Sequence, residues 1–144
     1  MRMTVENILN YFETLNTSKG LGIENFYIGK LDNKKDKSIG FYNLRAGREN
    51  EVIGGLNNKS DNELNVSILI HWTKKFRETD NFSNLFFDTL LKLQDENTVD
   101  NPLIIDGFKV NYIEMLSNNV DIGTDENGIY ERTINIRINY CKEI

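Results

Sequence analysis

A long alternating stretch near the C-terminal end of the chain restricts the fold more than any other feature. From Tyr130 to Tyr140, every second position carries a large side chain, mostly isoleucine, and the positions between are polar. A period of two is typical of a strand with one buried and one solvated face. The buried face needs a cover, so the chain must also supply helices with an apolar side.

Two segments have the period of an amphipathic helix. The first has one apolar face, formed by Val5, Ile8, Leu9, Phe12 and Leu15. Thr4 is its expected N-cap and Gly20 its expected stop. The second runs from about Asp80 to Leu93, with Thr79 or Asp80 as its cap, and its broad apolar stripe predicts substantial burial.

Between these helices the pattern changes to short strands and polar loops. Strands are predicted at Phe26–Leu31 and Ser38–Leu44, separated by the polar run Asp32–Lys37, so this pair is expected to form a hairpin that projects as an arm. The polar, glycine-containing connection Arg45–Asn62 is long for a compact domain, and such connections are often functional.

The remaining segments complete a sheet. Leu64–Thr73 alternates as a central strand, Asp106-Gly107 predicts a hairpin turn between two further strands, and Ser117–Gly128 reads as a turn region. The sequence therefore predicts an α+β fold in a single domain spanning residues 1–144. We expect an antiparallel sheet of about four or five strands, with two helices packed on one face and a projecting β-hairpin or loop arm.

Charge and cysteine content exclude several classes of protein. The net charge of −5 argues against gripping nucleic acid, although it suits a surface past which DNA slides. Cys141 is the only cysteine, so an internal disulfide or a cysteine-rich zinc site is excluded, and a reducing compartment is expected. Polar residues interrupt the N-terminus, and the apolar runs are too short to span a bilayer, so neither a signal peptide nor a membrane segment is expected.

Two segments resemble chemical sites. His71, the only histidine, could act as a general base, but it lies within a strand with no nucleophile paired to it, so a structural or solvent-facing histidine is favoured. The acidic segment 121–128 resembles a calcium loop, yet no register places glycine at position 6 and glutamate at position 12. Asn127-Gly128 favours a turn instead, and no metal or cofactor is expected.

Two small clusters of basic residues stand out. One contains Lys34, Lys35 and Lys37; the other contains Lys74, Lys75 and Arg77. Each is more typical of a solvated loop, and the alternative is a docking surface for an acidic partner or for passing DNA.

Three segments, in order along the chain, resemble the tail terminator family of bacteriophages of Gram-positive hosts, also called minor capsid proteins. They are residues 29–40 (GKLDNKKDKSIG), 68–74 (ILIHWTK) and 120–131 (VDIGTDENGIYE). The resemblance implies a structural virion protein with an α+β fold and no enzymatic activity.

Such proteins form a ring, usually of six subunits, at the head-proximal end of the tail tube. The ring stops tube polymerisation and provides the joint to the neck and head. The implied partners are other copies of the chain, the tail tube protein, the sheath and a neck or connector protein, with DNA passing through the lumen without specific binding and no membrane involved. The implied location is the junction of tail and neck in the virion, after assembly in the host cytoplasm.

Charged loops are the expected places of assembly contacts. The candidates are Lys30, Asp32, Lys34, Lys35, Lys37, Arg45, Arg48, Lys59, Lys74, Lys75, Arg77, Asp121, Asp125 and Glu126. Two other functions stay open: another head–tail connector, such as a head or tail completion protein, and, more remotely, a small ligand-binding domain or enzyme with a pocket near His71 or Asp121–Asp125.

Overall fold

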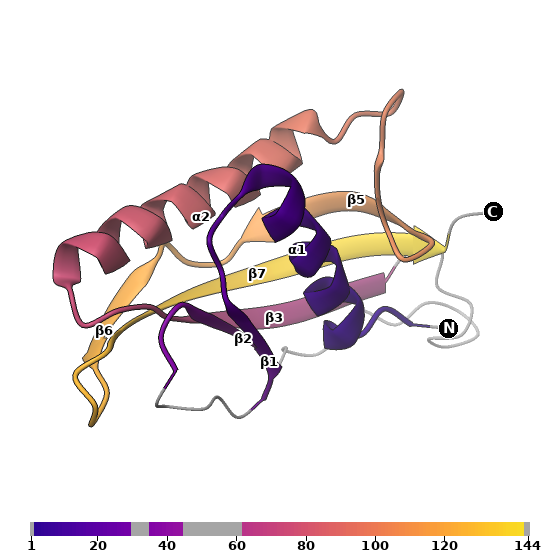
Figure 1. The fold of residues 1–144 in the computed structure, drawn as a ribbon. Helices are drawn as coiled ribbons and strands as arrows, with labels where there is room; N and C mark the ends of the chain where they lie inside the picture. Colours follow the sequence, from indigo (N-terminus) through magenta and orange to yellow (C-terminus); the bar gives the residue numbers. More distant parts are fainter. Residues whose placement is uncertain (1, 30–34, 45–61, 143–144) are drawn as a thin grey trace.

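The structure, a computed structural model, describes residues 2–29, 35–44 and 62–142 of the chain (Figure 1). The described helices are α1 (Val5–Lys19) and α2 (Phe76–Glu96), and neither is long and apolar enough to cross a membrane. The described strands are β1 (Asn25–Ile28), β2 (Ser38–Asn43), β3 (Asn62–His71), β4 (Leu103–Ile105), β5 (Phe108–Met115), β6 (Val120–Thr124) and β7 (Tyr130–Lys142). They form one sheet in the order β1-β2-β3-β7-β5-β4, and β6 pairs with the first residues of β7.

The two central strands pair so that their apolar side chains coincide on one face. Ile68 lies opposite Ile134 and Val66 lies opposite Ile136, and all four are fully buried. Both helices cover this face, α1 against β1 and β2 and α2 against β7 (Figure 1). The prediction of an α+β fold with two helices on one face of a sheet is confirmed.

Helix α1 starts and stops where the sequence predicts. Thr4 is the N-cap: its hydroxyl accepts from the backbone N–H of Asn7 at 3.4 Å, and its own N–H donates to the Asn7 side chain at 2.8 Å. At the other end Gly20 adopts the left-handed conformation, with φ of 62°, and donates to the carbonyl of Asn16. These contacts satisfy backbone groups that a helix end otherwise leaves unpaired.

Helix α2 begins earlier than the sequence predicts. Its first residue is Phe76 rather than Asp80, and its N-cap, Lys75, makes no capping bond through its side chain. Thr79 is fully buried inside the helix, where its hydroxyl donates to the carbonyl of Lys75 at 3.1 Å. The expected cap at Thr79 or Asp80 is therefore wrong, because the threonine hydroxyl is used within the first turns rather than before them.

A line of aromatic rings joins both helices to the sheet. Trp72, which follows β3, stacks on Phe82 of α2 with 3.5 Å between ring centroids and an angle of 7° between the planes. Phe82 contacts Phe86, which contacts Phe12 of α1 at 5.5 Å. Phe12 in turn stacks on Phe41 of β2 at 5.6 Å. Because each ring packs against the next, these contacts join the two helices to each other and to the sheet.

The sheet has more strands than the sequence predicts. Seven strands are present among the described residues, because the predicted turn region at 117–128 contains β6. The register of β6 shifts between Asp121 and Gly123, and Gly123 has a φ of 89°, so this short strand lacks a clear alternation in sequence. The turn between β4 and β5 is as predicted, with positive φ at both Asp106 and Gly107.

The predicted hairpin between the first two strands is wrong, since β1 and β2 run parallel. The backbone N–H of Lys37 donates to the carbonyl of Trp72 at 2.7 Å, and Lys37 accepts from Glu24 at 2.9 Å. The chain is thus held at the end of β3 before it enters β2, beside the start of β1, and the two strands must point the same way. Residues 30–34 of this connection lie outside the described residues.

Two adjacent leucines of α2 provide a test of this packing. Leu90 is fully buried and Leu91 is 39% exposed. We expect Leu90→Ala to lower the free energy of unfolding by about 2–5 kcal/mol, because it removes buried contacts and leaves a cavity. Leu91→Ala is the matched control and should cost less than about 1 kcal/mol. Urea unfolding monitored by circular dichroism measures both, and equal losses would contradict the orientation of α2.

Candidate functional site

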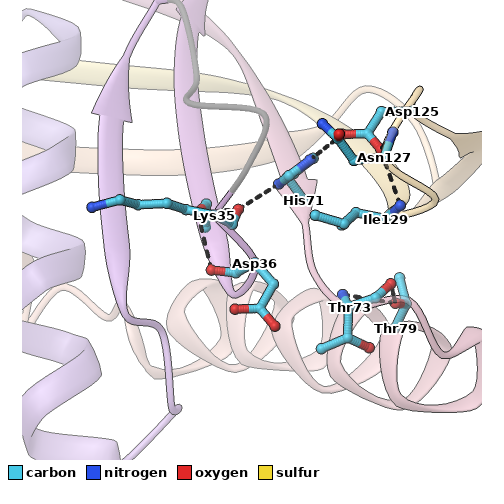
Figure 2. A network of polar contacts seen from close by, with 9 residues as sticks. Lys35, Asp36, His71, Thr73, Thr79, Asp125, Asn127 and Ile129 are labelled. Carbon is cyan, nitrogen blue, oxygen red and sulfur yellow. Dashed lines mark hydrogen bonds and ion pairs between the residues drawn. The ribbon is translucent and has the colours of Figure 1, made fainter.

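His71 is the centre of a buried polar network at the end of β3 (Figure 2). Its side chain is fully buried, and each ring nitrogen faces an oxygen atom. Nδ1 lies 2.8 Å from the carbonyl oxygen of Lys35, and Nε2 lies 2.6 Å from Oδ2 of Asp125. Lys35, His71 and Asp125 belong to the three segments 29–40, 68–74 and 120–131, which therefore meet at one imidazole ring.

Both hydrogen-bond partners of the His71 ring are oxygen acceptors. A carbonyl oxygen can only accept, so Nδ1 of His71 carries a hydrogen. Burial acts to raise the pKa of Asp125, but hydrogen bonds from His71 and from the backbone of Ile129 and Asn127 outweigh it, so the pKa lies below its usual value. Because the ionised Asp125 can only accept, Nε2 of His71 also faces an acceptor, 2.6 Å away.

A second carboxyl group lies beside this pair. Glu131 is directly opposite His71 in the register of β3 and β7. Burial raises the pKa of Glu131, the His71 cation opposes that rise, and the Asp125 charge adds to it. The two acids therefore differ: Asp125 is the ionised partner of His71, and Glu131 keeps its proton to a higher pH.

Asp125 also builds the turn between β6 and β7. Its Oδ1 accepts from the backbone N–H of Asn127 at 2.9 Å and from that of Ile129 at 3.0 Å. The carbonyl of Asp125 accepts from Gly128 at 3.1 Å, and Gly128 has a φ of 80°. The preference for a turn at Asn127-Gly128 is confirmed, and the turn is fixed directly to His71 through one carboxylate.

On its other side the network holds the chain that enters β2. The carbonyl of Lys35 accepts from the hydroxyl of Ser38 at 3.0 Å as well as from His71. Since both nitrogens of His71 are engaged and the ring is buried, its role is structural, and a solvent-facing histidine is wrong. The network positions residues 35–37 and the turn at 125–129 against the same end of β3.

The two lysine clusters meet at this end of the molecule. Lys37, Lys74 and Lys75 line one hollow of about 410 Å³, although the sequence separates them by more than thirty positions. Its other lining residues are Asp36, Thr73, Glu78 and Ile129. We refer to this part of the surface, with Lys35, Lys37, Lys74, Lys75 and Arg77, as the basic end.

The predicted assembly residues fall into three groups. Those at the basic end are exposed or half-buried, as is Glu126 in the adjoining turn. Two others are engaged within the chain: Asp121 lies 3.9 Å from Arg132, and the Asp125 side chain is only 10% exposed. Outside the described residues lie Lys30, Asp32, Lys34, Arg45, Arg48 and Lys59.

The sequence analysis missed the residue that attaches the start of α2 to the sheet. Arg132 is buried on the helix-covered face of β7, and its guanidinium lies 3.0 Å from Asp80 and 3.0 Å from Asn119. It also lies over the Phe76 ring, 5.4 Å from the centroid, a cation–π contact. A single cation among the isoleucines of an alternating strand was the signal that could have identified it.

The His71–Asp125 pair predicts a specific pH dependence. The pKa of Asp125 is lower in the folded than in the unfolded chain, so its contribution is complete above about pH 4 and is lost as pH falls further. Asp125→Asn should lower the free energy of unfolding by about 1.5–3 kcal/mol at pH 7, the value of a hydrogen bond to a charged group.

Unfolding in urea at pH 7 and at pH 3 measures this effect, and the difference from the natural chain should shrink at pH 3. Asp121→Asn is the control, because Asp121 is 45% exposed and should contribute less than about 1 kcal/mol. Equal effects of the two substitutions at pH 7 would contradict a special role for Asp125.

A search of curated proteins finds no match. The family model of bacteriophage tail terminator proteins matches residues 8–142, a region that contains α2, all described strands and the whole His71 network. The chain therefore belongs to the bacteriophage tail terminator family, a family of structural proteins of the phage tail.

Proposed function

We propose that this protein assembles into a hexameric ring that caps the head-proximal end of the phage tail tube. In this position it stops tube polymerisation and provides the joint to the neck and head. The observation that carries the proposal is the family match over residues 8–142, which extends over every described strand. Its partners are then the tail tube protein and a neck protein, its location is the virion, and its role is structural rather than enzymatic.

The two edges of the sheet support a ring. A closed ring of identical subunits requires two unlike surfaces on each copy, because each subunit contacts its neighbours head to tail. The sheet ends in β1 on one side and in β4 and β6 on the other. Ile28 is 48% exposed at the first edge and Ile122 is 49% exposed at the second, so both edges offer apolar side chains to a neighbour.

The charges on the sheet face opposite the helices suit a surface beside passing DNA. Arg137 on this face donates to Asn65 at 3.0 Å and to Glu114 at 3.1 Å, and Glu63 lies 3.7 Å away. The arginine is thus neutralised within the chain rather than available to phosphates. Together with the net charge of −5, this arrangement favours DNA transit without specific binding.

Electron microscopy with cognate tail tubes tests the function. We expect purified protein, mixed with tail tube protein during polymerisation, to give tubes of limited length with extra density at one end. Light scattering of the same mixture should show a species with the mass of six chains that binds tubes. The control is the tube protein polymerised with an unrelated acidic protein of similar size.

Two results would change the proposal. Tubes that grow without limit, beside protein that binds purified portal or neck assemblies, would make the chain a head–tail connector of another kind. Protein that binds neither tubes nor necks would remove the assembly function.

A further inference from the structure

The charges along α2 are reversed relative to those that stabilise an isolated helix. A helix N-terminus favours acidic side chains and its C-terminus favours basic ones. In α2, Lys74, Lys75 and Arg77 lie at or beside the N-terminus and outnumber Glu78, the acidic residue of the first turn, and Asp95 and Glu96 lie in the last turn, which has no basic residue. A charge pattern that opposes the helix dipole is expected where the charges serve a contact outside the subunit.

The loop that follows α2 is held by hydrogen bonds and presents an apolar side chain. In this α2–β4 loop, residues 97–102, the Asn97 side chain donates to the carbonyl of Val110 at 2.9 Å and accepts from the backbone of Leu103 at 2.9 Å. Val99 at its tip is 93% exposed, and Asp100 is the next residue. A loop that is held by hydrogen bonds and exposes a valine beside a carboxylate is suited to bind another surface, because little ordering is needed on contact.

The hollow at the basic end offers the complementary surface. Its three lysines outnumber its two acids, Asp36 and Glu78, around Thr73 and Ile129. The Lys75 ammonium is only weakly engaged, 3.8 Å from Glu78. Lys74, Lys75 and Glu78 of the hollow lie at the first end of α2, and the α2–β4 loop follows its other end (Figure 1). A helix of 21 residues is about 31 Å long, so one copy cannot place its own loop in its own hollow.

We propose that the Val99–Asp100 tip of one subunit docks in the hollow of the next subunit, with Asp100 beside Lys75. The contact joins unlike ends of the molecule, which is the head-to-tail kind of contact that a ring of identical subunits requires. It rests on the proposed ring function and names the surfaces that form it. Lys109, which lies near the loop, reduces the negative charge there but does not reverse it, since Asp95 and Glu96 precede the loop and Asp100 lies within it.

Cross-linking tests the contact directly. In a Cys141→Ser background, Val99→Cys combined with Lys75→Cys should give disulfide-linked oligomers up to the hexamer after mild oxidation. The matched control combines Val99→Cys with Leu85→Cys, because Leu85 is exposed on the same helix but away from the hollow. Cross-linking in the first pair alone supports the contact, and equal or no cross-linking in both overturns it.

Charge exchange provides the second measurement. Asp100→Lys should weaken assembly at least roughly tenfold in light scattering, as should Lys75→Glu, because each leaves like charges facing across the interface. The double variant should recover most of the loss, and Asp88→Lys, at an exposed position of α2 outside the contact, should have no effect. Thermal unfolding of each variant verifies that the fold is intact.

The outcomes separate this contact from the function itself. If Asp100→Lys and Lys75→Glu each still form rings that cap tubes, the contact is overturned and the capping function remains. If Lys75→Glu abolishes binding of short duplex DNA while the rings persist, the basic end is a DNA-binding surface and the contact is overturned. A protein that forms no ring and caps no tube would overturn both.

Discussion

The ion pair between His71 and Asp125 is the constraint on which the arrangement of the sheet depends. A buried imidazole ring with Nδ1 2.8 Å from the Lys35 carbonyl and Nε2 2.6 Å from Asp125 requires three distant segments to be in place at once. Removing His71 would leave the largely buried Asp125 carboxylate without its partner, which is more costly than losing a surface pair. The parallel pairing of β1 and β2 follows, because the chain must return to the end of β3 before it enters β2.

The aromatic contacts extend from the residue next to the ion pair to both helices. Trp72 follows His71 directly and stacks on Phe82, so the residue next to the polar network also fixes α2. Arg132 holds the first turns of the same helix from β7. The direction of α2 is therefore set at its basic end, and the position of the acidic loop beyond its C-terminus follows from the length of the helix.

Stability and assembly make different demands on α2. Its buried stripe follows the rules of an amphipathic helix, whereas its terminal charges oppose the helix dipole. The lysines at its start are accommodated because acidic side chains such as Glu78 lie among them and because the hollow remains open to solvent. These terminal charges are unfavourable in an isolated helix, and they fit the contact with another copy that is proposed above.

Local patterns in the sequence were sufficient for α1 with its caps at Thr4 and Gly20, the apolar stripe of α2 but not its first residue, the hairpin turn at Asp106-Gly107 and the alternation of β7, because each depends on residues a few positions apart. They also pointed to His71, to the acidic turn and to two lysine clusters. Only the tertiary structure decided that these features meet, that β1 and β2 run parallel and that Arg132 is buried. Those relations depend on which apolar faces and which buried charges find partners across the sheet, and neither a period nor a motif carries that information.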